Sequence, residues 1–359
     1  MEYLRDVFGK KQIKFLISAG VTLVVFLILL AIGAHIAAKQ KDQNLTKRWS
    51  DTNDFAQVTC MFTELAGFSE NSMKSLKMEI EEALKQESLV PANENARNYL
   101  TAMSAKGEAI LLSKDTELAV RAFGVDGDFF MFHPLDMISG SYFDGDDIMQ
   151  DHIILDEVAA WNLFGSTNIV GQVVMIDEIP HIVSGVYRRS DDRINRLAGN
   201  DVATVFMSIS ALKEHGQFTY INSCEVMMPN PIDDFAKNIV TESIGIDESK
   251  YDIFENSNRF HWTKLWQIVS KYGTRGMNSK GIVTPYWENV ARGVEDILAP
   301  ICVVACALLA YTFVVVALTL LRMWKLRRIH FKDIMNLIGR LVDRYRARKY
   351  KKIERGEYI

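Results

Sequence analysis

The chain has 359 residues, of which 48% are hydrophobic and 24% are charged, and its formal net charge is −4. This length allows one large or two medium domains together with membrane segments. Four cysteines do not provide a disulfide framework in a chain of this length, so the class of small disulfide-stapled proteins is excluded.

Two stretches without a formal charge, residues 15–38 and 297–321, define the class of protein. They contain 24 and 25 residues, and a helix needs about 20 residues to cross the hydrocarbon core of a bilayer. Lipid offers no hydrogen-bond partner to backbone groups, so each stretch is predicted to be a transmembrane helix. A cleaved signal peptide is the alternative for the first stretch, although its apolar part is longer than that of a usual signal.

Basic residues that flank the two spans predict the orientation of the chain. Residues 1–14 hold 4 Lys/Arg against 2 Asp/Glu, and residues 322–359 hold 13 against 4. Residues 39–296 hold 24 Lys/Arg against 39 Asp/Glu, a net charge of −15. The sequence therefore predicts a multi-pass protein of the plasma or inner membrane, with both termini cytoplasmic and a large extracytoplasmic domain.

Small residues in both spans predict surfaces where another helix can pack. Residues 1–14 are predicted to form an amphipathic helix at the inner membrane surface, leading into the first span. In that span Gly33 and Ala37 lie four residues apart, a spacing that allows close helix approach. Four small residues share a face of the second span: Ala299, Cys302, Cys306 and Ala310. Ordinary span composition is the alternative for the first span. The face of the second span is predicted to pack against the first span or another subunit, with thiol lipidation or metal binding as the alternative.

Residues 39–284 mix strand-like and helix-like segments without regular alternation. Strands are predicted at residues 55–62, 108–113, 118–125, 172–176, 181–187, 202–207, 220–228 and 251–255. Helices are predicted at residues 73–84, between Asp156 and Gly165, from Ile232 onward and at 262–272, with a short one before Gly216 that Ser208 or Ser210 can cap. This mixture predicts an α+β fold rather than a doubly wound sheet.

The outer segment carries no catalytic motif, and neither an enzyme activity nor a bound cofactor or metal is predicted. The acidic residues at 144–151 lack the spacing of an EF-hand loop and are interpreted as a solvated turn. Cys60 and Cys224 fall in predicted strands and can pair if those strands are neighbours. Two buried free thiols are the preferred interpretation.

The second span is flanked by a stalk and a basic tail. Trp287, Val290 and Val294 predict that residues 285–296 form a stalk helix that begins before the membrane. Within residues 322–359, four apolar residues recur at helical spacing: Ile334, Leu337, Ile338 and Leu341. With Arg327 and Arg328 nearby, they predict a basic amphipathic helix that lies on anionic lipid or docks in a groove of a cytoplasmic partner. A plain topology anchor is the alternative, and nucleic acid is not expected as a partner.

Residues 137–188 resemble the extracytoplasmic core domain of MacB-type ABC transporter permeases, a group that includes FtsX-like relatives. The resemblance lies in four motifs: ISGSYFDGDD, HIILDEVAAWNLFG, NIVGQVVMI and HIVSGVYR. It implies a MacB-like periplasmic core domain between two transmembrane helices. It also implies that ATP binds a separate ATPase subunit rather than this chain.

The resemblance implies a transmembrane subunit that couples a cytoplasmic ATPase to movement of an extracytoplasmic domain, for transport or for mechanotransmission. Such permeases usually have four spans, so this form with two implies a second permease subunit or a homodimer. The tail would contact the ATPase or the sister permease. The alternative function is a two-span sensor or scaffold that binds an outer ligand or partner without ATP coupling.

Overall fold

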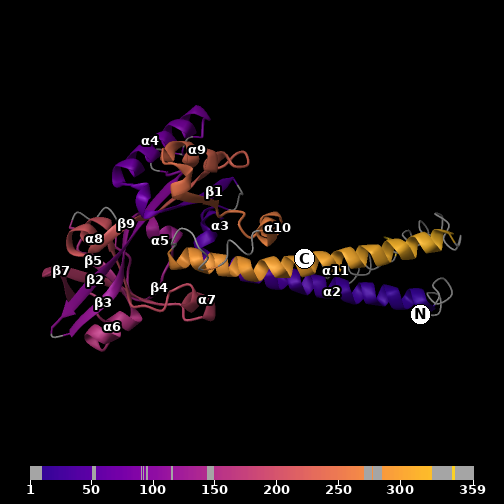
Figure 1. Cartoon of the computed structure of the whole chain (residues 1–359), viewed down its shortest axis with the longest axis horizontal. Coiled ribbons are helices and arrows are strands. Elements are labelled where there is room, and N and C mark those ends of the chain that lie inside the picture. The colour runs from indigo at the N-terminus through magenta and orange to yellow at the C-terminus, as the bar shows by residue number, and fades with distance from the viewer. Residues whose placement is uncertain are drawn as a thin grey trace, which may run out of the picture. The chain divides into compact units, whose positions relative to one another are not determined.

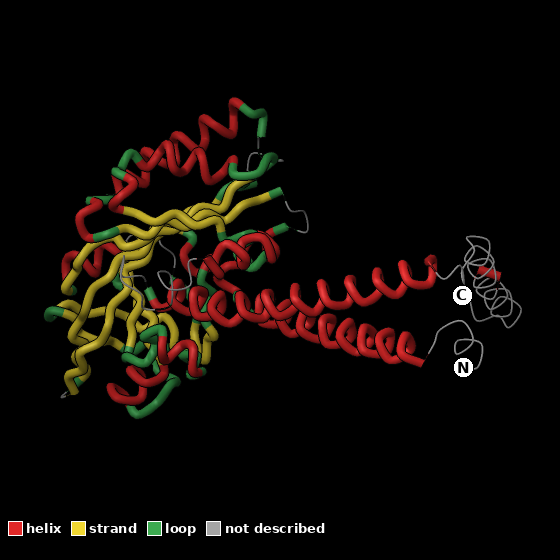
Figure 2. Tube along the Cα trace, turned by 45° about the vertical axis from the view of Figure 1, so that its right-hand side comes forward, coloured by secondary structure: helices red, strands yellow, loops and turns green. Residues whose placement is uncertain are grey.

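A computed structural model describes residues 10–325 apart from residues 51–53, 90, 92, 94–95, 115, 144–148, 271–276 and 278–284, together with residues 342 and 343. Contacts divide the chain into two units. The membrane unit contains the segments before Ala34 and after Pro300, and the outer unit comprises Ala34–Pro300. Figures 1 and 2 show the helices and strands of both.

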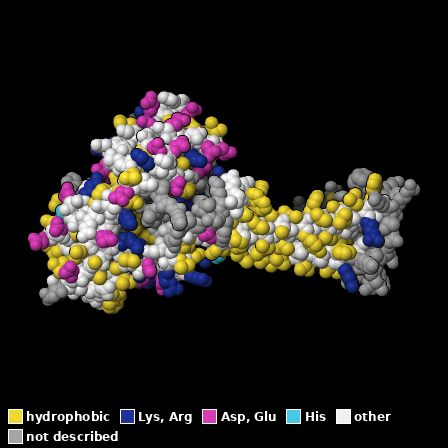
Figure 3. All heavy atoms as spheres, viewed as in Figure 1, with side chains coloured by type: hydrophobic (Ala, Val, Ile, Leu, Met, Phe, Trp, Pro, Cys, Tyr) yellow, Lys and Arg dark blue, Asp and Glu magenta, His cyan; other side chains and the backbone are white. Residues whose placement is uncertain are grey.

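Two helices are long and apolar enough to cross a membrane among the described residues, α2 (Lys10–Ala38) and α11 (Tyr286–Lys325). In the membrane unit they pack together through hydroxyl groups. Thr22 Oγ1 lies 2.8 Å from Thr312 Oγ1, and Ser18 Oγ lies 3.1 Å from the Tyr311 hydroxyl. Hydrogen bonds between transmembrane helices contribute about 0.6–2 kcal/mol each. Between their ends, the described helices of this unit present mainly apolar side chains on the face that Figure 3 shows.

The outer unit is built on one ten-stranded mixed sheet in the order β10-β1-β9-β2-β3-β8-β5-β7-β4, with β6 pairing β2 and β7. The pairs β3–β8 and β5–β7 are parallel, and the others are antiparallel. The strands are β1 (Phe55–Phe62), β2 (Leu100–Ser113), β3 (Thr116–Gly127), β4 (Asp136–Gly140), β5 (His152–Asp156), β6 (Val173–Ile176), β7 (Ile179–Arg188), β8 (Thr204–Ser208), β9 (Gln217–Pro229) and β10 (Tyr251–Glu255).

Six of these strands close into a ring. β2, β3, β8, β5, β7 and β6 each pair with the next, and β6 pairs back to β2 where Leu111 lies opposite Ile176 and Leu112 opposite Met175. A closed ring leaves no unpaired strand edge within it. β9, β1 and β10 extend the sheet from β2 as a three-stranded wing, and β4 extends it from β7.

The outer unit also contains helices, several of which pack on the sheet. The helices are α3 (Leu45–Trp49), α4 (Glu70–Gln86), α5 (Phe129–Phe132), α6 (Glu157–Phe164), α7 (Arg193–Leu197), α8 (Ile209–His215), α9 (Phe235–Ile244) and α10 (Trp262–Ser270), with 3₁₀ turns η1 (Lys41–Gln43), η2 (Glu64–Ala66) and η3 (Glu248–Lys250). Among them, α6, α8 and α9 pack on the sheet. Figure 1 shows α4 and α9 side by side over the wing. α4 buries Met73, Leu76, Ile80 and Leu84 at the spacing that its sequence predicts.

The α+β class predicted from the sequence is confirmed, and several strand limits are corrected. β2 begins at Leu100, eight residues before the predicted start, because its first six residues are buried and show no polar alternation. β4 and β5 are absent from the strands predicted from the local pattern, none of which lies between residues 125 and 172. α9 begins at Phe235 rather than Ile232, because Asp234 has a φ of 62°, outside the helical region.

Cys60 and Cys224 lie directly opposite each other in β1 and β9, and both are free and buried. The preferred interpretation of two buried thiols is therefore confirmed. Burial raises the pKa of both thiols, which keeps them protonated and unreactive at neutral pH.

The structure decides between the two candidate caps of α8, and this gives a first prediction. Ser208 Oγ accepts a hydrogen bond from the Ala211 amide at 3.0 Å, which satisfies a free N–H of the first turn. Replacing Ser208 by Ala is expected to lower the free energy of unfolding by about 1 kcal/mol. Ser210→Ala is the matched control and should change it by less than about 0.5 kcal/mol. Thermal unfolding of the purified full chain measures both, and equal losses would contradict the assignment.

Candidate functional site

The first turns of α11 carry charged side chains that are buried within the outer unit. Glu288, Arg292 and Glu295 follow one another at i, i+4 and i+7, so they lie on one face of the helix. Their exposed fractions are 1%, 6% and 1%. Arg259, from the turn after β10, is 4% exposed and lies against this face. We call these four residues the charged joint.

Arg259 holds both glutamates of the joint. Its Nη1 and Nη2 donate to the two carboxylate oxygens of Glu288 at 2.6 and 2.7 Å, and its Nε donates to Glu295 Oε1 at 2.7 Å. Arg292 Nε donates to Glu288 Oε1 at 3.1 Å. The planar guanidinium can make this forked contact, which a lysine cannot reproduce. Two positive and two negative charges balance, which offsets the cost of removing them from water.

The charged joint is attached to the edge of the sheet. Asn256 Oδ1 accepts from Arg259 Nη1 at 3.1 Å, and Asn256 Nδ2 donates to Thr59 Oγ1 of β1 at 2.8 Å. The guanidinium groups of Arg259 and Arg292 both lie 5.5 Å from the ring centre of Phe254 on β10, within reach of a cation–π attraction. The start of α11 is therefore fixed to β1 and β10.

Burial lowers the pKa of the Arg259 guanidinium, but the carboxylates of Glu288 and Glu295 outweigh burial and raise this pKa above its ordinary value. Arg259 therefore stays charged at every physiological pH. The joint is a permanent electrostatic connection rather than a titrating switch.

A second buried polar group connects α11 with the end of α2. We call it the His133 cluster, and it contains His133, Glu225, Asp42 and Trp287. His133 Nε2 lies 2.9 Å from Glu225 Oε1 on β9, and Nδ1 lies 3.6 Å from Asp42 Oδ1 in η1, directly after α2. The imidazole ring centre lies 4.8 Å from that of Trp287 on α11. This cluster therefore links η1, the central sheet and α11.

The charge of the His133 cluster follows from its neighbours. Burial lowers the pKa of His133, but the carboxylates of Glu225 and Asp42 outweigh burial and raise the pKa to about 10. The imidazole is therefore a cation at neutral pH, paired with the buried Glu225 carboxylate. Asp42 lies just after α2 and Trp287 lies in the first turn of α11, so within the outer unit this buried cluster links both helix ends to the sheet.

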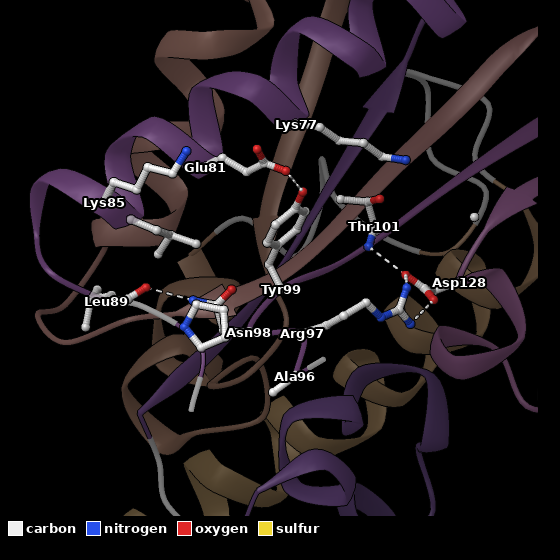
Figure 4. A pocket seen from close by; sticks show the side chains of 13 residues that line it. Lys77, Glu81, Lys85, Leu89, Ala96, Arg97, Asn98, Tyr99, Thr101 and Asp128 are labelled. Carbon is white, nitrogen blue, oxygen red and sulfur yellow. Dashed lines mark hydrogen bonds and ion pairs between the residues drawn. The ribbon is translucent and has the colours of Figure 1, made fainter. Parts of the chain in front are cut away.

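A polar cavity of about 680 Å³ lies away from these clusters, between α4 and the start of β2. Figure 4 shows Arg97 directed at Asp128, with Nη2 2.6 Å from Oδ1, and Tyr99 directed at Glu81, with its hydroxyl 2.6 Å from Oε1. Lys77 and Lys85 of α4 also line the cavity. The described residues contain no group of three or more His, Cys, Asp or Glu that could hold a metal ion. Most of the side chains that line the cavity are polar or charged.

The small residues predicted as packing surfaces differ in their exposure. Gly33, Ala37, Cys302 and Cys306 are half-buried, Ala299 is fully buried in the outer unit, and Ala310 is exposed. The α2–α11 hydrogen bonds given above involve other residues, so the role of these surfaces stays a prediction. The predicted docking residues of the tail lie outside the described residues: Arg327, Arg328, Ile334, Leu337, Ile338 and Leu341.

The charged joint is absent from the sequence-based predictions, which concern the apolar side of the same helix. Trp287 and Val294 of that side are indeed buried. One feature of the sequence could have revealed the charged joint. Glu288, Arg292 and Glu295 recur at i, i+4 and i+7 directly before a charge-free stretch, where a charge is costly unless it is paired.

Comparison with known proteins identifies the family. The sequence profile of the MacB-like periplasmic core domain matches residues 15–240. This chain belongs to the MacB-like periplasmic core domain family. The resemblance predicted from the motifs at residues 137–188 is therefore confirmed. The charged joint lies beyond residue 240, outside the matched part.

Curated relatives of this MacB-like chain are much longer proteins. The macrolide export ATP-binding/permease protein MacB of Salmonella typhi is 26% identical over 180 residues, which cover 48% of this chain and 27% of that protein. The protein of the same name from Agrobacterium fabrum is 32% identical over 118 residues, 31% of this chain and 18% of that protein. The matched part of the chain thus spans about a quarter of the length of the first of these relatives.

Two solved structures are similar to the MacB-like chain. The periplasmic region of MacB from Actinobacillus actinomycetemcomitans aligns with a TM-score of 0.39 and 17% identity, covering 63% of this chain and 94% of that one. The extracellular domain of the transporter YknZ from Gram-positive bacteria aligns with a TM-score of 0.36 and 15% identity, covering 55% and 99%. Family membership and the two apolar helices place the protein in a membrane.

Proposed function

We propose that this protein is a transmembrane subunit of a MacB-type ABC transport or mechanotransmission complex, with both termini in the cytoplasm. A separate ATPase subunit supplies the energy, and this chain carries movement to the outer unit. Family membership, the two apolar helices and the basic flanks of the spans support this proposal. The observation that carries it is the charged joint, which fixes the start of α11 to the sheet.

The joint suits the transmission of force because buried ion pairs resist gradual displacement. The Arg259 fork contacts Glu288 and Glu295 across two turns of α11, so a tilt or rotation of these turns must move Arg259 with them. Arg259 in turn moves Asn256 and the edge of the sheet. Packed polar and apolar contacts respond as discrete units rather than stretching continuously. The His133 cluster gives the end of α2 a matching attachment.

The proposed partners are an ABC ATPase, and a second permease subunit or a second copy of this chain. The amphipathic tail supplies the cytoplasmic contact, with Ile334, Leu337, Ile338 and Leu341 in a groove of the partner and the basic residues at its rim.

Purification of the full chain in mild detergent is expected to recover a nucleotide-binding subunit. A variant in which Ile334, Leu337, Ile338 and Leu341 are all replaced by Ser keeps every basic residue of the tail, so the orientation of the chain is preserved. This variant should lose the nucleotide-binding subunit because its apolar docking face is gone. Met335→Ser, on another face of the same predicted helix, is the matched control and should retain it.

Failure to recover any nucleotide-binding subunit with the wild-type tail would contradict the proposal.

The second candidate, a two-span sensor or scaffold, is favoured by the polar cavity beside α4. It requires that deletion of residues 326–359 leaves function intact while orientation survives. Replacement of Lys77 and Lys85 by Gln would then abolish the response to an outer ligand.

A further inference from the structure

The short helix α10 exposes large apolar side chains to its surroundings. Trp262, Trp266 and Val269 are 62%, 53% and 36% exposed, whereas Leu265 and Ile268 are buried against the outer unit. At 100° per residue, the exposed three form one stripe directly beside the buried pair. Two neighbouring indole rings on one face form an apolar patch that solvated surfaces rarely present.

The start of α10 lies at the level where α11 loses its charges. Arg259, three residues before α10, contacts Glu295, and Glu295 lies two residues before the charge-free stretch that begins at Ile297. Two residues of helix correspond to about 3 Å along the axis.

The position of α10 relative to the end of α2 independently places the start of α10 near the membrane boundary. His261, the residue before α10, lines one cavity together with Ala37, which is the penultimate residue of the first charge-free stretch. All of these residues belong to the outer unit. The start of α10 is thus close to the membrane boundary of both helices.

We propose that α10 lies in the headgroup layer of the outer leaflet and buries Trp262, Trp266 and Val269 against lipid. Tryptophan is enriched at membrane–water interfaces, because its ring is apolar while its N–H can still find a polar partner. The other side of α10 is polar, with Thr263 and Gln267 facing away from the apolar stripe. An amphipathic helix with this division lies in the plane of the interface. The start of α10 lies near the residues where both charge-free stretches meet the rest of the outer unit, which favours lipid over a protein partner.

The contact between α10 and lipid fixes the distance of the charged joint from the membrane surface. The turn that carries Arg259 leads directly into α10, so lipid that holds α10 also holds this turn at the membrane surface. The proposal concerns lipid alone and does not depend on ATP coupling.

Fluorescence quenching by lipid tests the proposal on the full chain. The protein is reconstituted in nanodiscs of phosphatidylcholine that carries bromine on its acyl chains, and the loss of tryptophan fluorescence is compared with that in unbrominated lipid. Trp262→Phe with Trp266→Phe should reduce the quenched part of the emission by half or more. Trp161→Phe, which removes an exposed tryptophan from α6, is the matched control and should leave the quenched part unchanged. Trp324 of α11 contributes equally in every variant.

The depth of Trp262 and Trp266 in the bilayer provides a second measurement. Bromine near the glycerol backbone should quench the component due to Trp262 and Trp266 more strongly than bromine near the chain ends. Equal quenching in the wild type and the double variant would overturn the proposal. Quenching of the component due to Trp262 and Trp266 by aqueous iodide, but not by brominated lipid, would overturn it as well.

Discussion

Replacing Arg259 by Met is expected to lower the free energy of unfolding of the outer unit by about 3–5 kcal/mol. The change leaves Glu288 and Glu295 buried, with Arg292 as the one remaining cation of the joint. Removing one partner of a buried ion pair costs more than the pair contributes, because an uncompensated charge stays out of water. Denaturant unfolding of the purified full chain, with hydrogen exchange on peptides from β10 and the start of α11, measures the loss.

A second variant separates charge balance from general damage. Replacing Arg259 and Glu288 together by Met leaves Arg292 and Glu295, which still balance, and should restore most of the lost stability. Arg188→Met is the matched surface control, since Arg188 is 62% exposed and its ion pairs are 3.8–4.0 Å long. It should change stability by less than about 0.5 kcal/mol. An Arg259→Met variant as stable as this control would show that the joint is not a structural connection.

The stability of the outer unit is expected to fall as the pH rises above neutral, because of His133. Its pKa is about 10 in the folded chain, against about 6.5 when unfolded. A raised folded pKa contributes stability that is complete below pH 6.5 and is lost as the pH rises toward 10. Between pH 7 and pH 9 the loss should be about 2–3 kcal/mol, at 1.36 kcal/mol per pKa unit.

His133→Gln tests this origin of the pH dependence. The variant keeps a side chain that can donate to Glu225 but cannot carry charge. Free energies of unfolding at intervals from pH 6 to pH 10 should therefore converge for the wild type and the variant as the pH rises. A constant difference across this range would mean that His133 is neutral in the folded chain. The other titrating groups are common to both proteins and cancel in the comparison.

Local patterns in the sequence predict the elements whose residues act over short distances. The apolar spacing from Met73 to Leu84 defines α4, and the same rule defines the two membrane helices. Asp156 is recognised as a cap, and Ser208 as one of two candidates, because a cap acts on an amide three residues away. β5 is missed because its five residues are mostly buried and run directly into α6.

The candidate site is missed because its contacts join residues far apart in the chain. Arg259 meets Glu288 across 29 residues, and His133 meets Glu225 across 92. Such pairs leave no periodic pattern, and each partner alone resembles an ordinary surface charge. The polar cavity beside α4 is missed for the same reason, because it forms only where residues 96–101 lie against that helix.

The six-stranded ring and the three-stranded wing differ in how they can deform. A strand of the ring cannot shift without displacing its neighbours on both sides, and the hydrogen bonds return to the starting strand, so the ring is stiff in every direction. The wing ends at β10, which pairs only with β1 among the described strands, and it joins the ring only through the pairing of β9 with β2. Because Arg259 follows β10, a load applied through the charged joint enters the sheet at an edge strand of the wing. The stiffness of the wing therefore determines how much of any movement of α11 reaches the ring.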